Sequence, residues 1–454
     1  MMTEIGATIF ARASAPGRAG VAVFRVSGPR VADLVSALTT KPLVPRMAHH
    51  RVIHAHDGSV IDHGIMVYFQ GPASFTGEDV LELHLHGAPA VARALFRTLE
   101  EAGCVLAEPG EFSLRALQNG KMDLAAAEGL SDLLAAETDG QRHQALRQYG
   151  GALSDQATAW RTDLIKILAS IAADIDFPDE EDVPADVIRS ATLTLEHLTA
   201  TLSRALETAD YALRVREGVT IALIGAPNAG KSSLLNRLAG SDLAIVSDEP
   251  GTTRDIVETP LEIAGQLVRV ADTAGIRLET ESAIEKEGIR RTMVCAQEAD
   301  RRVLVVDASE ADFTVSRETI DLLQSDDVIL LNKADQQITG ALRSAAEALA
   351  KQTKTALLTL SAKTGDGVTA LTDYLAEDFN ETAGSPALLT RERHVSHVRQ
   401  ARDALGRAKE NLHKVPELAA EDIRLAARAF DHITGKIHVE EVLGDVFSNF
   451  CIGK

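Results

Sequence analysis

The chain has 454 residues, which exceeds the size of one compact domain and predicts two or three domains of about 100 to 200 residues each. Its apolar content of 45% and charged content of 25% are typical of globular proteins. The net charge of −20 excludes a general nucleic-acid coat protein, because so negative a surface repels phosphate backbones. A local contact with RNA, or one made through a more basic partner, stays open.

The sequence carries no sign of membrane insertion or secretion. No stretch approaches the roughly 20 apolar residues of a membrane span, and the N-terminus lacks the apolar core of a signal peptide. We therefore expect a cytoplasmic protein that makes no membrane contact. The cysteines Cys104, Cys295 and Cys451 lack C-x-x-C spacing, so the sequence supports neither a disulfide framework nor a zinc site.

The N-terminal part, from Ile5 to about Gly120, is rich in predicted strands. Residues 21–26 and 80–86 form runs of strand-forming residues that are bounded by glycine and proline turn signals. We expect residues 1–120 to fold as an α+β domain.

Helical patterns follow this domain and return near the end of the chain. Apolar residues recur with i, i+3, i+4 spacing at 160–171 and again at 395–412. We expect helical parts at 121–216 and 381–454. We favour one helical domain interrupted by an insertion, although two separate bundles would give the same periodicity.

Residues 217–380, between the two helical parts, are predicted to form an α/β domain. Short apolar runs alternate there with amphipathic helices, which indicates a mostly parallel sheet with helices on both faces. The chain is therefore predicted to be multidomain. The apolar runs are 220–224, 267–271, 303–306, 328–331 and 356–360.

A phosphate-binding loop is predicted after the strand that ends at Ile224. Residues 225–232 match the pattern G-x-x-x-x-G-K-[ST] between a strand and a helix. In such a loop, backbone N–H groups and the helix N-terminus face the phosphates, Lys231 supplies a point charge and Ser232 holds Mg²⁺. The residues assigned to this loop are Asn228, Ala229, Gly230, Lys231, Ser232 and Ser233.

The choice of base is predicted by the segment Asn332-Lys333-Ala334-Asp335, which follows a buried strand. The carboxylate of Asp335 can accept hydrogen bonds from N1–H and the exocyclic amine of guanine. Adenine lacks both donors at these places, and a buried carboxylate left unpaired is costly. The segment Ser361-Ala362-Lys363 follows the next strand and completes the pocket for the base.

The parts that contact Mg²⁺ and the γ-phosphate are predicted between these motifs. Asp272 ends a strand, where its carboxylate can bind Mg²⁺ through water, and the N–H of Gly275 can contact the γ-phosphate. A threonine in the polar loop 251–255 suits Mg²⁺. Ile276 stands where Ras-type GTPases carry a water-orienting glutamine, so hydrolysis needs another base and another positive charge. The strand-end segment assigned here is Asp272, Thr273, Ala274 and Gly275.

Three further segments carry a resemblance to a known family. They are Ser74–Asp79, the stretch Ala107–Leu124 with its Glu-Pro-Gly-Glu-Phe sequence, and the terminal Phe450–Lys454. Together with the GTP motifs, they resemble the tRNA-modification GTPases of the MnmE/TrmE type, and the resemblance covers the whole chain. The GTP motifs occur in many GTPases, whereas the Glu-Pro-Gly-Glu-Phe stretch and the Cys-x-Gly-Lys end are specific to this family.

The resemblance implies an architecture, an activity and partners. It implies a folate-binding N-terminal domain that dimerises, a helical domain split by the GTPase domain, and a heterotetramer with a flavoprotein of the MnmG/GidA type. The pair adds a carboxymethylaminomethyl or aminomethyl group to carbon 5 of the wobble uridine of certain tRNAs. The implied one-carbon donor is 5-formyl- or 5,10-methylene-tetrahydrofolate, and the implied ions are Mg²⁺ and K⁺.

The resemblance also assigns roles to individual residues. It implies that the water-activating residue is Glu285 and that Cys451, near the folate, acts as a nucleophile or acid/base in one-carbon transfer, although a bystander thiol is the alternative. The folate residues implied are Arg25, Glu82, Lys121 and Lys454. The Mg²⁺ residues are Ser232 and Thr253, and the K⁺ residues are Asn228, Ser247, Glu249 and Thr252.

The sequence permits two other interpretations. The GTP site alone would suit a non-catalytic GTPase switch that assembles ribosomes or RNA complexes, and only the N-terminal domain and the Cys451 tail argue against it. His84 and His86 lie on one strand face near several other histidines, but no supporting cysteine or carboxylate spacing accompanies them. We expect these histidines to be exposed or hydrogen-bonded rather than metal ligands.

Overall fold

The computed structural model describes residues 6–176, 186–245, 258–272, 293–380, 387–436, 450 and 453. The chain divides into two compact units. Unit 1 comprises Met1–Leu134, Leu146–Thr199 and Gln400–Lys454, and unit 2 comprises Ala135–Ala145 and Ala200–Arg399. Among the described helices, none combines the length and the apolar character that crossing a membrane requires.

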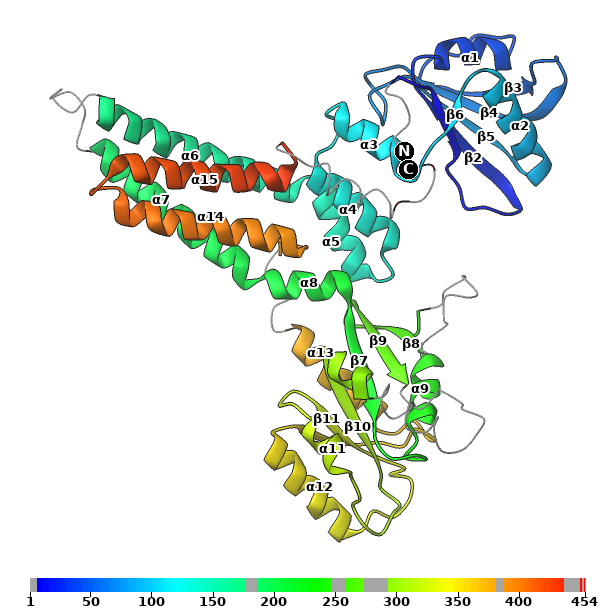
Figure 1. Cartoon of the computed structure of the whole chain (residues 1–454). Coiled ribbons are helices and arrows are strands. Elements are labelled where there is room, and N and C mark those ends of the chain that lie inside the picture. The colour runs from blue at the N-terminus through cyan, green and yellow to red at the C-terminus, as the bar shows by residue number, and fades with distance from the viewer. Residues whose placement is uncertain are drawn as a thin grey trace. The chain divides into compact units, whose positions relative to one another are not determined.

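The N-terminal part of unit 1 is built on a six-stranded sheet (Figure 1). Its strand order is β3-β4-β5-β2-β1-β6, and all neighbours are antiparallel except β1 and β6. The elements are β1 (Ile9–Arg12), β2 (Ala19–Ser27), α1 (Val31–Leu38), β3 (Ala48–His54), β4 (Val60–Phe69), β5 (Val80–Gly87), α2 (Pro89–Glu101) and β6 (Val105–Leu106).

The helices α1 and α2 pack on one face of this sheet. Phe24 and Leu83 point to that face and are buried in one cluster with Leu34 of α1 and Leu95 of α2. Successive side chains of a strand point to opposite faces. Arg25, next to Phe24, therefore lies on the other face of the sheet.

Helices make up the rest of unit 1, but of the helices given below, most of α5 belongs to unit 2, and α7 and α14 each cross from one unit into the other. The long helices α6 and α15 pack against each other, with the rings of Trp160 and Phe430 5.3 Å apart and an ion pair of 2.8 Å between Arg161 and Asp431. These helices precede and follow the α/β segment in sequence. The elements are α3 (Glu111–Gln118), α4 (Leu124–Ala135), α5 (Asp139–Tyr149), α6 (Ala152–Asp176), α7 (Asp186–Glu207), α14 (Glu392–Asn411) and α15 (Pro416–Thr434).

A second six-stranded sheet forms the centre of unit 2, with the order β12-β11-β10-β7-β9-β8. All neighbours are parallel except the edge pair β8 and β9, as the alternation of apolar runs and helices predicts for most of the sheet. The elements are α8 (Ala209–Glu217), β7 (Val219–Ile224), α9 (Lys231–Ala239), β8 (Glu258–Ile263), β9 (Gln266–Asp272), β10 (Arg301–Asp307), α11 (Arg317–Asp321), β11 (Val328–Asn332), α12 (Gly340–Thr353), β12 (Ala356–Thr359) and α13 (Val368–Asn380).

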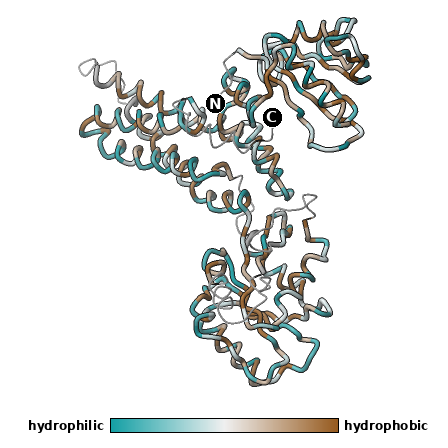
Figure 2. The backbone as a smooth tube through the Cα atoms, turned by 45° about the vertical axis from the view of Figure 1, so that its right-hand side comes forward, coloured by the Kyte–Doolittle hydropathy of each residue, from teal (hydrophilic) through white to brown (hydrophobic). Residues whose placement is uncertain are grey.

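Both faces of this sheet are covered, which explains why its strands are apolar throughout. Leu223 and Val305 belong to the core on the face of α9 and α13, whereas the adjacent Ile224 and Val306 belong to the core on the face of α12. Figure 2 shows these strands as the most hydrophobic segments of unit 2. A parallel sheet buried on two sides shows continuous apolar runs in place of alternation.

A buried ion pair connects β10 to the loop that precedes β11. Arg302 is 2% exposed and Asp327 is fully buried, and the Arg302 Nε donates to Asp327 Oδ2 over 2.7 Å. Asp327 also accepts the backbone N–H groups of Arg302 and Gln324. Its carboxylate therefore satisfies three donors that have been removed from water.

We predict that Asp327→Ala destabilises unit 2 by about 3–5 kcal/mol, because it leaves a buried guanidinium without its counter-charge. The matched control is Asp326→Ala, since Asp326 pairs with Arg301 at the surface with its own side chain 64% exposed. Exposed pairs contribute about 0–1 kcal/mol. Denaturant dependence of hydrogen exchange in peptides that cover β10 and β11 measures both changes. Equal losses in the two variants would contradict the prediction.

Candidate functional site

The loop between β7 and α9 has the backbone of a phosphate cradle. Gly225, Asn228 and Gly230 have φ of 136°, 63° and 98°. A Cβ at Gly225 would lie 2.2 Å from the Val305 carbonyl oxygen, and one at Gly230 would lie 2.1 Å from the Asn332 Nδ2. The two glycines are therefore required by close approach as well as by conformation.

The charged and hydroxyl residues of this loop stand at the beginning of α9. Lys231 is buried, and its ammonium donates to the carbonyl oxygens of Gly225 and Ala226 over 2.8 and 2.9 Å. The ammonium therefore lies inside the loop, where it can meet a phosphate. Ser232 and Ser233 are exposed in the first turn of α9, and the N-terminus of a helix favours an anion.

Asn332, the last residue of β11, joins the phosphate loop to the loop after β12. Its side chain is 1% exposed, its Nδ2 donates to the Ala229 carbonyl over 2.8 Å, and its Oδ1 accepts the Ala362 N–H over 3.0 Å. The structure thus brings together two segments that the sequence assigned separately to phosphate and base.

Asp335 lies at the same end of the sheet and is exposed. Its Oδ1 accepts a hydrogen bond of 2.7 Å from the hydroxyl of the buried Ser361. This bond lowers the pKa of Asp335 below its usual value, with further help from the charges of Lys363 and Lys333. The carboxylate is therefore ionised at neutral pH and is ready to accept N–H donors.

The backbone of the loop after β12 is held by a residue that sequence reasoning missed. Arg237 of α9 donates from Nε to the Ala362 carbonyl over 3.0 Å and from Nη2 to the Lys363 carbonyl. It belongs to α9, the helix that follows the phosphate loop, so it is a second connection between the two loops. Its position in a helix gave no sequence signal.

Asp307 is another residue that the sequence analysis did not select. It ends β10, and it forms an ion pair with Lys333, which has a φ of 63°. Burial opposes ionisation, but hydrogen bonds from Lys333 and Ser309 outweigh it and lower the pKa of Asp307. The rule that selected Asn332, a polar residue at the carboxyl end of an apolar strand, would also have selected Asp307.

The residues expected to contact Mg²⁺, K⁺ and the γ-phosphate fall largely outside the described residues. Asp272 ends β9 beside Leu223 of β7, so its backbone lies at the same sheet edge as the phosphate loop. The predicted site residues outside the described part of the chain are Ser247, Glu249, Thr252, Thr253, Thr273, Ala274, Gly275 and Glu285.

A second set of predicted residues meets on the face of the N-terminal sheet opposite α1 and α2. Arg25 and Glu82 are cross-strand partners on β2 and β5, and Arg25 donates twice to Glu82 Oε1, over 3.0 and 2.8 Å. Arg25 also donates to the carbonyl oxygen of Gly453 over 3.3 Å. The guanidinium carbon lies 5.4 Å from the ring centre of Phe75 and 5.8 Å from that of Phe112.

The C-terminal residues that the structure describes are anchored in the same region. Phe450 is 4% exposed in a cluster with Leu124, and Gly453 is buried with a φ of 104°. A Cβ at Gly453 would lie 2.7 Å from the Arg12 carbonyl oxygen, so only glycine fits. Lys121 is exposed, and its Cε would lie 3.3 Å from a Cβ at Gly77. Cys451 and Lys454 lie outside the described residues.

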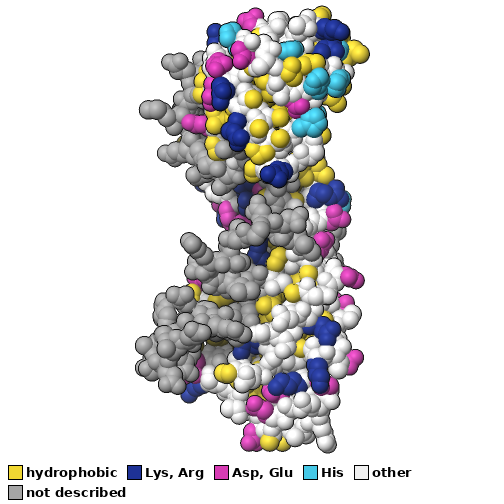
Figure 3. Space-filling model, turned by 90° about the vertical axis from the view of Figure 1, so that its right-hand side faces the viewer, with side chains coloured by type: hydrophobic (Ala, Val, Ile, Leu, Met, Phe, Trp, Pro, Cys, Tyr) yellow, Lys and Arg dark blue, Asp and Glu magenta, His cyan; other side chains and the backbone are white. Residues whose placement is uncertain are grey.

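The histidines gather with apolar side chains on one face of the N-terminal domain (Figure 3). His86 Nδ1 lies 2.9 Å from Asp62 Oδ1, and the rings of His50 and His63 stack with centres 6.4 Å apart. Within the described ranges, no three histidine, cysteine or carboxylate side chains converge as a metal site would require. His84 Nε2 lies 3.6 Å from Glu82 Oε2, beside the Arg25 pair.

Comparison with known proteins shows matches that cover both parts of the chain that carry candidate sites, the N-terminal domain and unit 2. The family model of the MnmE helical domain matches residues 124–451, and that of the GTP-binding protein TrmE N-terminus matches residues 8–121. The chain is 48% identical over 98% of its length to the tRNA modification GTPase MnmE of Caulobacter vibrioides, of which it covers 99%. It is 48% and 46% identical, with the same coverage, to the proteins of that name from Phenylobacterium zucineum and Maricaulis maris. The chain therefore belongs to the family of MnmE tRNA modification GTPases.

Proposed function

We propose that this chain, a GTPase of the MnmE family acting in tRNA modification, hydrolyses GTP in unit 2 to drive a folate-dependent modification of the wobble uridine. The observation that carries the proposal is the junction at Asn332, which holds the phosphate loop and the base loop at one sheet edge. The modification adds a carboxymethylaminomethyl or aminomethyl group to carbon 5 of the base. The test is reconstitution with GTP, a flavoprotein partner, methylene-tetrahydrofolate and tRNA, and no modified uridine in the complete mixture would contradict the proposal.

In the proposed GTP site, Lys231 meets the β- and γ-phosphates and Asp335 accepts the guanine N–H groups. The exposed Ser232 suits Mg²⁺, together with Thr253, and Mg²⁺ would neutralise charge on the phosphates. Ile276 cannot orient water, so we assign that role to Glu285. We assign charge compensation to K⁺, with Asn228, Ser247, Glu249 and Thr252 as its ligands. Asn228 stands in the loop between β7 and α9, the proposed phosphate loop, which supports its part in this set.

In the proposed folate site, Arg25, Glu82, Lys121 and Lys454 bind a 5-formyl- or 5,10-methylene-tetrahydrofolate. The meeting of Arg25, Glu82 and Gly453 supports a shared site for strand residues and tail. Cationic groups suit the glutamate carboxylates of a folate, and a carboxylate suits the pterin N–H donors. We assign Cys451 the role of nucleophile or acid/base in one-carbon transfer.

We propose a homodimer that forms a heterotetramer with a flavoprotein of the MnmG/GidA type in the cytoplasm. The ion pairs on the helices support a role for the partner protein in binding tRNA. Several basic side chains of the helices already pair with carboxylates, so they attract the phosphates of tRNA less strongly. The pairs are Arg142–Asp139, Lys166–Asp163, Arg402–Asp403, Arg407–Asp422, Lys409–Glu196 and Arg424–Glu421.

The domain division that we propose is 1–120 for the folate-binding and dimerisation domain, 217–380 for the GTPase domain, and 121–216 with 381–454 for one helical domain. The packing of α6 against α15 supports one helical domain with an inserted GTPase domain over two separate bundles. When segments that are far apart in the sequence share a hydrophobic core, they fold together as one unit.

Asp335→Asn should change the preferred base. Xanthine presents an acceptor where guanine presents its amine, and the amide of asparagine can donate to it, so GTP affinity should fall at least about tenfold while xanthosine triphosphate gains affinity. Nucleotide titration of both triphosphates measures the switch. Unchanged GTP binding would contradict the assigned pocket.

GTP hydrolysis should be several-fold faster in K⁺ than in Na⁺, because K⁺ would supply positive charge near the β- and γ-phosphates. Asn228→Ala should remove this difference and leave GDP binding nearly intact. Single-turnover hydrolysis in matched chloride salts measures the effect. Equal rates of the wild-type chain in both salts would exclude the potassium assignment.

Cys451→Ser should abolish tRNA modification and spare both GTP hydrolysis and dimer formation, because a hydroxyl is a far weaker nucleophile than a thiolate. Mass spectrometry of the tRNA nucleosides, run beside a phosphate-release assay, measures the two activities. Full modification by the variant would show that the thiol is a bystander.

A further inference from the structure

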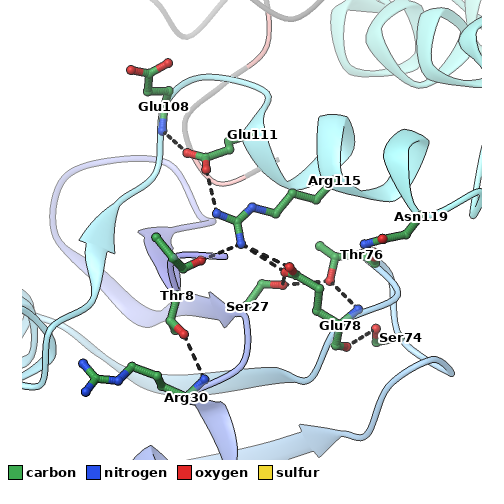
Figure 4. Close-up of polar contacts among 11 residues, drawn as sticks. Thr8, Ser27, Arg30, Ser74, Thr76, Glu78, Glu108, Glu111, Arg115 and Asn119 are labelled. Carbon is green, nitrogen blue, oxygen red and sulfur yellow. Dashed lines mark hydrogen bonds and ion pairs between the residues drawn. The ribbon is translucent and has the colours of Figure 1, made fainter. Parts of the chain in front are cut away.

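Figure 4 shows a cluster of two carboxylates and one guanidinium, in which Glu111 and Arg115 are buried and Glu78 is half-buried, and no role assigned above uses it. Arg115 of α3 donates from Nη2 to Glu111 Oε1 over 2.9 Å and from Nη1 to Glu78 Oε2 over 3.2 Å. It also donates to the Ala7 carbonyl over 2.8 Å. The side chain of Arg115 is only 9% exposed, so its partners replace water. We call Glu78, Glu111 and Arg115 the Arg115 latch.

The Arg115 latch joins two different segments. Glu78 belongs to the loop 70–79 between β4 and β5, whereas Glu111 and Arg115 belong to α3. A second tie, from Asn119 Nδ2 to the Thr76 carbonyl over 2.7 Å, holds the other end of α3 to the same loop. The latch therefore fixes the loop 70–79 against α3.

Each of these two segments carries one aromatic ring beside Arg25. Phe75 lies on the loop and Phe112 lies on α3, and the Arg25 guanidinium lies within 6 Å of both ring centres, at 5.4 and 5.8 Å. A planar guanidinium is attracted to such ring faces. Holding the loop against α3 thus holds the two rings around the group that binds Glu82.

The same loop also reaches the C-terminal tail. Phe75 packs on the cluster that contains the buried Phe450 and Leu124, and Arg25 donates to the Gly453 carbonyl. The tail therefore has two anchors, one on the loop that the latch fixes and one on the arginine that the two rings enclose.

We propose that Glu78 and Arg115 are positioning residues that hold the C-terminal tail against the Arg25–Glu82 pair. They act through Phe75, Phe112 and Arg25 and touch no ligand themselves. This inference rests on the proposed function, in which the tail and the pair share a folate site. Opening of the latch frees Phe75 and lowers the fraction of chains whose tail is anchored.

The test compares two isosteric variants of the full-length chain, Glu78→Gln and Glu111→Gln. Each removes one charge from the partners of Arg115, but of these two carboxylates only Glu78 belongs to the loop 70–79, so Glu111→Gln is the matched control. The measured quantity is hydrogen exchange in the C-terminal peptide that contains Phe450 and Gly453. Glu78→Gln should speed this exchange at least about tenfold, and Glu111→Gln should leave it within about twofold, because only the first change releases the loop.

Two further measurements separate positioning from general loss of structure. GTP hydrolysis and the exchange of β2 and β5 should be unchanged in Glu78→Gln, and Arg115→Lys should retain more of the tail protection than Arg115→Met, since it keeps the charge. Equal exchange of the tail in both glutamine variants, or no change in either, would overturn the latch. If the wild-type chain binds no reduced folate but the two variants still differ in tail exchange, the latch stands and the proposed function fails.

Discussion

The buried amide of Asn332 is the interaction on which the described part of the GTP site depends. Its two polar ends satisfy backbone groups of two loops, the carbonyl of Ala229 and the N–H of Ala362. Removing such a shared partner leaves buried polar groups unsatisfied, at a cost of about 1–3 kcal/mol each. Because the proposed function assigns one loop to the phosphates and the other to the base, this single side chain would set the spacing between the two ends of a bound nucleotide.

In unit 1, Arg115 also connects two segments through one side chain, but it does so with a charged guanidinium where Asn332 uses a neutral amide. A buried ion cluster of this kind is weak evidence for stability, since apolar replacements of equal volume are often as stable. An apolar cluster, however, imposes no direction on the loop 70–79. Two carboxylates on different segments, bound by one rigid fork of donors, fix both the distance and the orientation between loop and helix. Asn332 joins two loops and Arg115 joins a loop to a helix, and in both cases the joined segments carry other functional groups.

The sequence predicted most of unit 2 and less of unit 1 for a physical reason. Strands that are buried on both faces, such as β10 and β11, appear as apolar runs that few other structures produce. The strand β8 was not expected, because its turn to β9 uses Ala264 and Gly265, both with positive φ, and alanine gives no turn signal. The pairing of α6 with α15 was also beyond sequence patterns, which identify an apolar face and not the helix that covers it.

For the candidate sites, the sequence points to residues with a chemistry suited to a ligand, and not to the residues that hold them in place. Asn332 and Asp335 follow a strand, so the topology of a parallel sheet brings them to one edge. Asp307 obeys the same rule, but its importance depends on the ion pair with Lys333, a contact across 26 residues. Arg115 lies within a stretch that served only as a family signature, and its partner Glu78 is 37 residues away. The structure gives a physical reason for that signature. Residues that mark the family in sequence hold the loop 70–79 against α3 and place two aromatic rings beside Arg25.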